Sequence, residues 1–454
     1  MVRAKSPGGR VRLAALSVAL CGAVVLAAFA AEDAKDKDVP RDKLGAAAVE
    51  HQEQVLDELL PPADGVKVPA GVDPTVWQAL IPKDNQPTPE RLALGKKLYF
   101  DKRLSHDGTA SCATCHDITR GLTDQLPTSE GIRKQFGKRN AQTTFNVALL
   151  HIFFWDGRSP SLEHQARQPI LNPVEMGMPD EETALGAIKD DPEYQKMFKE
   201  AYGRDVNYED VGRAIAAFER TFVFLDSPFR RYLRGDDDAI SADAKAGWVL
   251  FNGKARCVSC HHMNPSNPLG TDNRFHNVGV SARHQNFEKL AVDALKALKD
   301  DPSEQKLDEL AVGTDLSELG RFMVTQNRAD IGSFRTPQLL NIGITQPYMH
   351  DGSMATLWDV MDHYNKGGEA NPFLDGGMEP LALTEQEIDQ VVAFLFTLTD
   401  DRFAEENERE FELQKTQSRK ERPFRDDEMA FRRKLGFEDR ISGQATEKTE
   451  KGAK

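Results

Sequence analysis

Apolar residues recur at helical spacing through most of the chain, whereas the alternating pattern typical of half-buried strands is scarce. The clearest helical stretch covers residues 90–100, and shorter ones cover residues 183–189 and 193–201. Residues 208–224 also carry apolar side chains along one face, and residues 287–298 form an amphipathic pattern. Long stretches without periodicity separate these segments. The pattern predicts a mostly α fold in which helices are joined by long loops.

A short local pattern occurs twice along the chain. Residues 95–100, Gly-Lys-Lys-Leu-Tyr-Phe, precede one cysteine pair, and residues 247–251, Gly-Trp-Val-Leu-Phe, precede another. Although the repeat is short, it indicates two related domains. A charged, glycine-containing run at residues 234–238 supplies the boundary between them, and Ser241 is a candidate N-cap for the helix that follows.

The domain organisation follows from these breaks. We predict one domain over residues 85–238 and a second over residues 239–400, each built around one cysteine pair. An N-terminal extension or linker covers residues 32–84, and a densely charged C-terminal tail, compatible with helix or with disorder, covers residues 401–454. Residues 284–319 form a charged insertion, which we interpret as a surface elaboration rather than a site.

The first 31 residues predict export. Four basic residues precede an apolar run over residues 13–28, which ends in Ala28-Phe29-Ala30, the pattern of a cleaved signal peptide (1–31). A retained membrane anchor is the alternative, although the run is short for a spanning helix. We therefore expect a soluble periplasmic protein with no membrane span after cleavage.

The acidic balance of the chain narrows its possible partners. The chain contains 58 Lys and Arg against 72 Asp and Glu, which gives a net charge of −14. This charge disfavours binding to nucleic acid and to anionic membrane surfaces. It favours a docking partner with a basic face, such as a small redox protein.

Four of the five cysteines form two copies of one motif. Cys112-Ala113-Thr114-Cys115-His116 and Cys257-Val258-Ser259-Cys260-His261 both have the spacing of c-type haem attachment sites. Two thiols at this spacing can reach the two vinyl groups of one porphyrin, and the following histidine then lies beneath the iron as its proximal ligand. A four-cysteine zinc site and two thioredoxin-like redox pairs are the alternatives, but both leave the two histidines unexplained. We therefore predict two covalently attached c-type haems, one in each domain.

The ligand opposite each histidine decides what a haem can do. Two strong axial ligands make an electron carrier, whereas an open distal position binds and activates oxygen species. His151 and His164 follow the first motif, but each has the character of a surface or structural residue. The stretch from Trp155 to Glu175 is more suggestive, because a carboxylate held over an open haem can transfer the proton that peroxide cleavage requires.

Several short segments occur in a specific order and spacing. They are Ser-Cys-Ala-Thr-Cys-His at 111–116, Arg-Asn at 139–140, Phe-Trp-Asp-Gly-Arg at 154–158, Val-Glu-Met at 174–176, Phe-Arg-Thr-Pro at 334–337 and Pro-Tyr-Met-His-Asp-Gly at 347–352. By these segments the chain from about residue 85 to residue 400 resembles the bacterial di-haem cytochrome c peroxidases and their MauG-like relatives. The resemblance implies two cytochrome-c-like haem domains and an oxidoreductase that acts on hydrogen peroxide.

The resemblance also implies roles for individual residues. By it, His116 is the proximal ligand of the peroxidatic haem, and Gln165, Pro169 and Glu175 line its distal pocket, with Glu175 as the acid/base. Trp155 matches a tryptophan placed between the two haems, where it would relay electrons. A calcium ion at the domain interface is implied as well, and the matching positions are Asn140, Thr345 and Pro347.

Two positions depart from the reductively activated members of the family. Ile132 stands where those members have a histidine that caps the peroxidatic iron, and isoleucine cannot bind iron. The resemblance therefore implies a peroxidatic haem that is open in the ferric state. Tyr364 stands where they have a methionine on the second haem, as in MauG-like members, and a phenolate ligand favours ferric iron. Met361 and His363 remain alternative ligands.

Three functional hypotheses follow. The first is a di-haem peroxidase that reduces hydrogen peroxide with electrons from a cytochrome c or a copper protein. The second is a MauG-like enzyme that uses peroxide to oxidise side chains of a partner protein. The third is a di-haem electron carrier without catalysis, and it predicts that neither ferric haem binds cyanide or reacts with peroxide.

Overall fold

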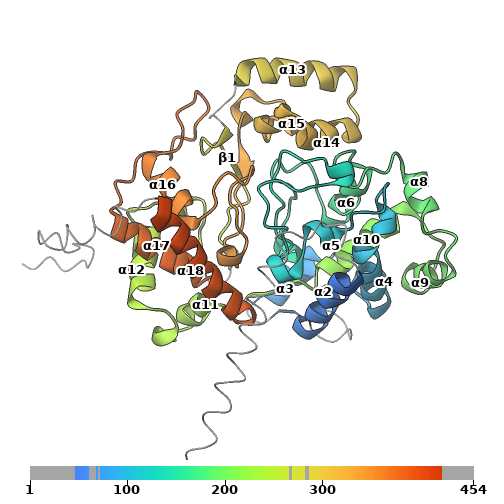
Figure 1. The fold of residues 1–454 in the computed structure, drawn as a ribbon, viewed down its shortest axis with the longest axis horizontal. Helices are drawn as coiled ribbons and strands as arrows, with labels where there is room; N and C mark the ends of the chain where they lie inside the picture. Colours follow the sequence, from blue (N-terminus) through green and yellow to red (C-terminus); the bar gives the residue numbers. More distant parts are fainter. Residues whose placement is uncertain (1–45, 61–67, 70–71, 265–267, 282–285, 422–454) are drawn as a thin grey trace, which may run out of the picture. The chain divides into compact units, whose positions relative to one another are not determined.

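Helices and long loops make up nearly all of the computed structural model, which describes residues 46–60, 68–69, 72–264, 268–281 and 286–421 (Figure 1). Within these ranges the strands are β1 (Phe275–His276) and β2 (Phe334–Arg335), which pair in antiparallel fashion. The prediction of a mostly α fold is therefore confirmed. Among the same residues, no helix is both long and apolar enough to cross a membrane. The predicted signal peptide lies outside the described residues.

The helices fall along the chain in two series. The part before residue 239 contains α2 (Ala46–Leu59), α3 (Pro74–Leu80), α4 (Pro89–Phe100), α5 (Cys112–Cys115), α6 (Leu162–Gln165), α7 (Gln168–Leu171), α8 (Glu181–Gly186), α9 (Pro192–Tyr202), α10 (Tyr208–Glu219) and α11 (Pro228–Leu233). The part after it contains α12 (Ala242–Asn252), α13 (Phe287–Asp300), α14 (Glu304–Gly313), α15 (Phe322–Thr325), α16 (Leu357–Lys366), α17 (Glu385–Phe396) and α18 (Ala404–Glu421). Residues from Gln54 onward form one unit by their contacts, and this unit holds both cysteine motifs. The domain boundary at residue 238 stays a prediction.

A tight helix crossing lies just before the first cysteine motif. α4 begins at Pro89, because Thr88 caps it and accepts a hydrogen bond from the Arg91 amide. α4 then crosses α10 at Gly95, where an added Cβ would lie 2.0 Å from the carbonyl oxygen of Ala214. A residue without a side chain is needed for so close an approach. The crossing fixes α4, whose last turn leads toward the first motif.

A capped helix that crosses a later helix at a glycine also precedes the second motif. α12 begins after Ser241, whose hydroxyl accepts a hydrogen bond from the Ala244 amide and confirms the predicted N-cap. α12 crosses α17 at Gly247, where an added Cβ would lie 1.9 Å from the carbonyl oxygen of Gln390. Gly247 begins the second copy of the short sequence repeat, just as Gly95 begins the first. The repeat in the sequence thus corresponds to a repeat in the packing.

Alanine at either crossing glycine is expected to destabilise the fold. The substitution favours the helix itself by roughly 1 kcal/mol, but the methyl group would overlap the backbone of the facing helix, and overpacking costs about 1–3 kcal/mol or more. We expect Gly95→Ala and Gly247→Ala to lower the melting temperature in differential scanning calorimetry. Gly186→Ala in α8 is the matched control, because no atom lies within 4 Å of its added Cβ. Equal destabilisation by all three substitutions would contradict the packing explanation.

The helix predicted over residues 208–224 ends earlier than its apolar pattern. α10 stops at Glu219, because Asn146 binds the residues that follow. The Asn146 amide donates to the Phe222 carbonyl at 2.7 Å, and the Phe224 amide donates to the Asn146 side-chain oxygen at 2.8 Å. Phe222 and Phe224 are both buried, so the apolar spacing continues although the helix does not. A tertiary contact overrides the local pattern here.

The charged insertion folds as two helices that share a small apolar core with α15. α13 agrees with the predicted amphipathic helix, and α14 follows it. The interpretation of the insertion as a surface elaboration is wrong for α14. Asp308 of α14 is only 4% exposed, and it accepts hydrogen bonds from Arg158 at 2.8 Å and from Asn172 at 2.5 Å. α14 therefore packs onto the segments that carry the predicted distal residues.

The C-terminal tail is helical over its described part. α18 packs on α16, and its buried Gln414 bridges two loops. The Gln414 amide nitrogen donates to the Gly343 carbonyl at 3.2 Å and to the Tyr348 hydroxyl at 3.0 Å. Its amide oxygen accepts a hydrogen bond from the Leu357 amide at 3.0 Å, at the start of α16. The rest of the tail, residues 422–454, lies outside the described residues.

Candidate functional site

The first cysteine motif presents one imidazole nitrogen to a ligand. His116 follows the last residue of α5, which Ser111 caps. Nδ1 of His116 lies 3.3 Å from the Leu122 carbonyl oxygen, and the Tyr99 hydroxyl donates to the His116 carbonyl at 2.8 Å. Burial lowers the pKa of His116, which keeps the imidazole neutral. With Nδ1 engaged, Nε2 is the nitrogen available to a metal, in an orientation that the Nδ1 contact fixes.

The second motif presents its histidine in the same way. Cys257 begins a single 3-10 turn, η7 (Cys257–Ser259), and His261 comes two residues after it. Nδ1 of His261 lies 2.8 Å from the Gly270 carbonyl oxygen, and burial lowers the pKa of His261. None of the four motif cysteines forms a disulfide with another described residue, so their sulfurs are available for haem attachment. Each motif thus combines two thiols with one neutral, oriented imidazole.

A large cavity adjoins the second motif. It has a volume of about 270 Å³, and its wall includes Cys257, Cys260 and His261. The rest of the wall is largely apolar, with side chains that include Phe251, Leu339, Val360, Leu381, Val391 and Leu395. An apolar cavity with two thiols and one imidazole at its wall has the chemistry that a covalently attached porphyrin requires. The residues present therefore fit the predicted haem.

Two of the three predicted second ligands line this cavity. Tyr364 and Met361 both belong to its wall, whereas His363 does not. Nε2 of His363 lies 2.8 Å from the Val278 carbonyl oxygen, so its ring is engaged elsewhere. Burial raises the pKa of the Tyr364 phenol, and the nearby motif thiols raise it further. The phenol thus lies close to the thiols, and Tyr364 and Met361 remain the candidates.

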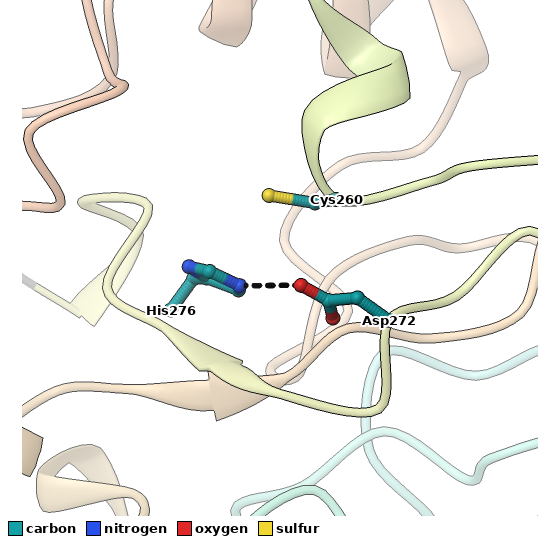
Figure 2. Close-up of side chains that lie close together, drawn as sticks. All are labelled: Cys260, Asp272 and His276. Carbon is teal, nitrogen blue, oxygen red and sulfur yellow. Dashed lines mark hydrogen bonds and ion pairs between the residues drawn. The ribbon is translucent and has the colours of Figure 1, made fainter.

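Two further side chains with donor atoms, Asp272 and His276, lie beside Cys260 of the same motif (Figure 2). Cys260, Asp272 and His276 place ligand atoms within 4.8 Å of one another, the only such group in the part of the chain that the structure describes. Nε2 of His276 lies 3.0 Å from Asp272, and Nδ1 lies 2.7 Å from Asp375. Since haem attachment would use the Cys260 sulfur, we assign no separate metal site here. The four motif cysteines do not converge within the described residues, which excludes the zinc alternative.

The predicted distal residues of the first haem lie on consecutive short elements. Gln165 ends α6, and Pro169 lies in α7. Glu175 lies in the loop that follows, which folds back so that the Met176 amide donates to the Pro169 carbonyl at 3.1 Å. The His106 amide donates to the Met176 carbonyl at 2.8 Å and ties this loop to the segment before the first motif. The structure thus brings Pro169 and the Glu175 loop together.

Glu175 has a buried carboxyl oxygen without a partner. Its Oε2 atom makes no hydrogen bond to any described residue. Burial raises the pKa of Glu175 to about 8; nearby Asp308 also raises it, and Arg158 acts in the opposite direction. A carboxyl group with a pKa near neutrality can accept a proton and return it. This property suits the predicted acid/base role.

Ile132 packs directly against the Glu175 loop. Its side chain is 1% exposed, and its amide donates to the Glu175 carbonyl at 2.9 Å. Two glycines permit the approach, because an added Cβ would lie 1.8 Å from the Val174 carbonyl at Gly131 and 2.0 Å from the Ile132 side chain at Gly177. The position that matches the capping histidine is therefore filled by an apolar side chain that offers no donor atom to iron.

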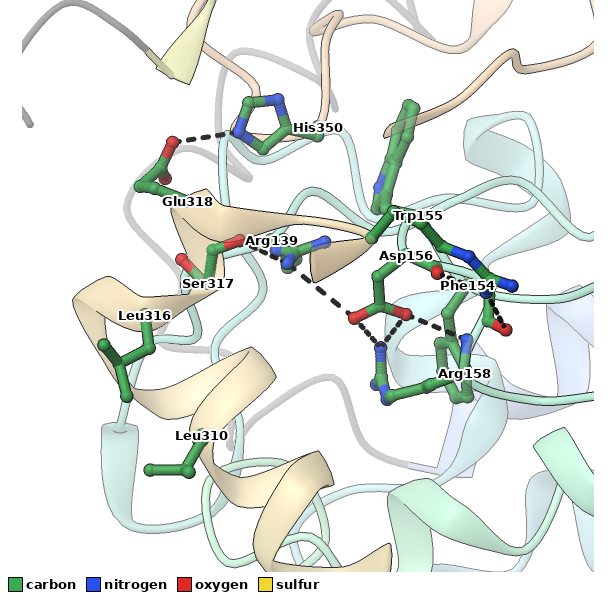
Figure 3. A network of polar contacts seen from close by, with 12 residues as sticks. Arg139, Phe154, Trp155, Asp156, Arg158, Leu310, Leu316, Ser317, Glu318 and His350 are labelled. Carbon is green, nitrogen blue, oxygen red and sulfur yellow. Dashed lines mark hydrogen bonds and ion pairs between the residues drawn. The ribbon is translucent and has the colours of Figure 1, made fainter. Parts of the chain in front are cut away.

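Trp155 lies in the wall of the cavity at the second motif. Its indole nitrogen donates to the Asn140 carbonyl at 3.0 Å, and the Arg335 amide donates to the Trp155 carbonyl at 2.8 Å. The next residue, Asp156, is fully buried between the guanidinium groups of Arg139 and Arg158 (Figure 3). Trp155 is thus fixed on both sides, next to an ion network that reaches Arg158 near Glu175.

The three predicted calcium positions all belong to the wall of that cavity. Asn140, Thr345 and Pro347 all line it. The Asn140 amide nitrogen donates to the Leu126 carbonyl at 2.9 Å, which leaves the amide oxygen as the donor atom for a cation. Amide and backbone oxygens are ligands that calcium prefers. The arrangement is compatible with a calcium ion, which stays a prediction.

The two histidines considered as distal ligands have other surroundings. His151 is exposed. Nδ1 of His164 lies 2.9 Å from the Ser159 hydroxyl, and Nε2 lies 3.1 Å from the Glu304 carboxylate. Both ring nitrogens of His164 are therefore engaged with side chains, as expected for a structural residue.

Sequence reasoning missed the pair of charged residues that meets beside Glu175. Arg158 belongs to a segment that the family resemblance highlights, but it received no role, and Asp308 is one of many carboxylates in a charged insertion. The helical spacing of α14 holds a signal nevertheless. Asp308 precedes Ala311 and Val312, both buried, by three and four residues, so it shares their buried face.

Comparison with known proteins points to one family. The family model of the di-haem cytochrome c peroxidases matches residues 89–238. The chain is 39% identical over 319 residues to the methylamine utilization protein MauG of Methylorubrum extorquens, a match that covers 70% of this chain and 80% of that protein. It is 37% identical over 329 residues to the cytochrome-c peroxidase IdrP1 of Denitromonas iodatirespirans, with 70% and 84% covered. Among solved structures, a MauG-like protein associated with microbial copper homeostasis matches with a TM-score of 0.58 and 29% identity, over 71% of this chain and 92% of that one.

Proposed function

Since this chain belongs to the family of di-haem cytochrome c peroxidases, we propose that it reduces hydrogen peroxide at a haem bound by His116. In this reaction one peroxide takes up two electrons and two protons and yields two water molecules. Electrons would enter at the second haem, bound by His261, and would pass Trp155 on their way to the first. Family membership identifies the protein as an oxidoreductase and implies two c-type haems.

The main support for this proposal is the buried carboxyl group of Glu175, whose pKa is raised to about 8. The haem, when bound, supplies the iron at which peroxide binds and is cleaved. The Glu175 carboxylate accepts a proton from the near oxygen of the peroxide, and the resulting acid gives it to the far oxygen. With a pKa of about 8, a minority of Glu175 is the proton-accepting carboxylate near neutral pH, and the acid formed after proton transfer is stable enough to return the proton.

The ferric enzyme is expected to react with peroxide without prior reduction. Ile132 offers no donor atom and packs against the Glu175 loop, so this position holds no ligand that must leave first. Stopped-flow mixing of the fully ferric enzyme with stoichiometric hydrogen peroxide should therefore change the Soret band at once. A spectrum that stays constant until the second haem is reduced would contradict an open ferric haem.

A second candidate function is the oxidation of side chains of a partner protein. Tyr364, if it rather than Met361 binds the second haem, would favour this function, because a phenolate ligand stabilises high oxidation states over electron delivery. The 39% identical relative that carries the name MauG points the same way. Steady-state turnover with reduced cytochrome c separates the two functions. Rapid turnover supports the peroxidase, whereas negligible turnover with intact peroxide reactivity supports oxidation of a partner protein.

Two observations favour the peroxidase over an electron carrier without catalysis. The relatives that match over most of the chain include proteins named cytochrome-c peroxidase, and a proton-transfer group of suitable pKa stands in the predicted distal loop. Cyanide is the simplest probe, because it binds ferric haem only where an axial position is open. Binding of one cyanide per chain is the outcome expected for the peroxidase.

The proposed function includes a cellular compartment and an electron donor. We infer a periplasmic enzyme exported by the leader at residues 1–31, since c-type haem attachment fits an exported chain. The net charge of −14 suits an electron donor with a basic face, such as a small cytochrome c or copper protein.

A calcium ion held by Asn140, Thr345 and Pro347 is expected to stabilise the protein. The wild-type enzyme, treated with EGTA and then titrated with calcium chloride, should melt at higher temperature as calcium binds. At a free concentration roughly 100-fold above Kd, the stabilisation is about 2.7 kcal/mol. Asn140→Ala should lose this calcium-dependent increase. A wild-type melting temperature that does not respond to calcium would speak against the site.

A further inference from the structure

We propose that Asp308, supplied by the inserted helix α14, is a positioning residue that holds the distal acid/base Glu175 and its loop in place, an inference that rests on the proposed role of Glu175. Asp308 would not touch peroxide. It acts through two buried partners, Arg158 on one side and Asn172 on the other. The insertion thereby becomes part of the peroxide site.

Asp308 fixes the Arg158 guanidinium. Its Oδ1 atom accepts a hydrogen bond from Nε at 2.8 Å and lies 2.8 Å from Nη2. Arg158 also donates to Asp156 at 3.1 Å, and its guanidinium carbon stands 3.6 Å from the centre of the Phe154 ring (Figure 3). The Arg158 side chain is only 3% exposed. Because the guanidinium is planar with donors in a rigid fork, these three contacts determine its position.

Asp308 also fixes the loop that carries Glu175. Its Oδ2 atom accepts a hydrogen bond from the Asn172 side chain at 2.5 Å. Asn172 is 1% exposed and organises the loop, since its side-chain oxygen accepts the Val174 amide at 3.0 Å. Its carbonyl accepts the amides of Glu175 at 3.2 Å and Gly177 at 2.8 Å. Removal of Asp308 would deprive a buried amide of its closest acceptor and loosen these bonds.

The charges around Glu175 show what Asp308 contributes electrostatically. The charged groups that face Glu175 are Asp308 from α14 and Arg158 from the segment after Trp155. On the neighbouring loop, the apolar side chain of Ile132 packs at Gly177, two residues after Glu175, and brings no charge. Asp308 opposes the Glu175 carboxylate directly, and it also balances the Arg158 charge that would favour that carboxylate. Both effects keep the Glu175 carboxyl group near its neutral form.

The contacts at the two ends of α14 explain why Asp308 lies next to Arg158 and Asn172. At the start of α14, the Glu304 carboxylate lies 3.1 Å from Nε2 of His164 on α6. Near its end, the Val312 carbonyl accepts a hydrogen bond from the Lys138 amide at 2.8 Å. These contacts hold α14 across two segments of the first haem region, with Asp308 between them.

The test compares Asp308→Asn with Glu309→Gln. Glu309 is the next carboxylate on α14, and its hydrogen-bond partner is Lys306 of the same helix. The haem-loaded ferric proteins are mixed with hydrogen peroxide, and separately with cyanide, over a range of pH. Asp308→Asn is expected to move the inflection of both rate profiles to lower pH by about 1 unit or more, because a like charge beside Glu175 is removed. Glu309→Gln should keep the wild-type inflection, and a merely structural role of Asp308 would lower stability without moving it.

Glu175→Gln, measured in parallel, separates the two claims. If it abolishes the inflection while Asp308→Asn leaves the inflection at the wild-type pH, Asp308 is not the positioning residue and the role of Glu175 stands. If Glu175→Gln itself keeps the wild-type inflection, the acid/base role fails and the role of Asp308 fails with it.

A second variant covers the case in which Asp308→Asn does not fold, since it leaves buried Arg158 with one carboxylate fewer. The double variant Asp308→Asn/Asn172→Asp exchanges the two side chains across their 2.5 Å hydrogen bond and keeps the total charge. It should load both haems and retain the inflection of the wild type. An exchanged pair that loads haem but has lost the inflection would overturn the proposal.

Discussion

Glu175→Gln is expected to retain both covalently bound haems and to lose most of its reactivity with hydrogen peroxide, by a factor of about 10²–10⁴. The amide has nearly the shape of the carboxyl group, so the loop and the Asn172 contacts remain, but it cannot accept the proton of the peroxide. The second-order rate constant, measured by stopped-flow at the Soret band, reports the loss. Haem content per chain, measured in the same sample, shows that attachment is intact.

Glu219→Gln is the matched control for this experiment. Glu219 is also buried, also has an unpartnered Oε2 among the described residues, and burial raises its pKa to about 8 as well. It lies on α10, near Cys112 of the first motif but outside the predicted distal loop, so it tests whether any buried carboxyl group in this region suffices. A large loss of peroxide reactivity in both variants would point to a general effect of buried carboxyl groups near the first motif, and unchanged kinetics in Glu175→Gln would remove Glu175 from the reaction.

The pH dependence of the wild-type rate has a definite sign. Below pH 8 Glu175 is mostly protonated and cannot accept a proton, and above pH 8 it is mostly the carboxylate. The rate constant for peroxide should therefore rise as pH increases through about 8 and then level off. Glu175→Gln should show no such rise.

Tyr364→Phe is expected to abolish the low-spin EPR signal of the second haem in its wild-type form. If the phenol is the second ligand, the phenyl ring leaves that axial position open, and the second haem becomes high-spin. The cavity wall offers Met361 as a replacement, and a new methionine–haem absorption band would report that substitution. The ferric protein before mutation should show one high-spin haem and one low-spin haem without this band.

Met361→Leu is the control, because it changes the other candidate in the same wall. It should leave the low-spin signal and the optical spectrum as they are. A signal that survives Tyr364→Phe but changes in Met361→Leu would assign the ligand to Met361. No variant of His363 is needed in this experiment. Its ring nitrogen Nε2 lies 2.8 Å from the Val278 carbonyl oxygen, so it is not available to bind the haem iron.

The parts of the molecule that sequence could predict are those set by local chemistry. The two attachment motifs depend on a spacing of two thiols and one histidine, so each is complete within five residues. The helices around Gly95 and Gly247 show in the apolar spacing, and the cap at Ser241 shows in its side chain. Such features need no knowledge of what lies across the fold.

The parts that escaped prediction are tertiary contacts between distant segments. Asp308 contacts Arg158 only because α14 packs against α6. No local sequence pattern predicts that these two helices pack together. The early end of α10 depends on Asn146, which lies far upstream. His363 and Tyr364 are neighbours on one helix and point in different directions, so only the packing of α16 decides which of them lines the cavity.

The two glycine crossings have a consequence for haem attachment. Each crossing joins the helix just before a cysteine motif to a helix much later in the sequence: α4 packs on α10, and α12 packs on α17. Each motif precedes its closing helix in the sequence, so haem attachment before that helix docks would find the thiols accessible to the porphyrin. Contacts between distant segments form late because the loop between them must close first. Docking of α10 on Gly95 and of α17 on Gly247 would then complete the two haem regions.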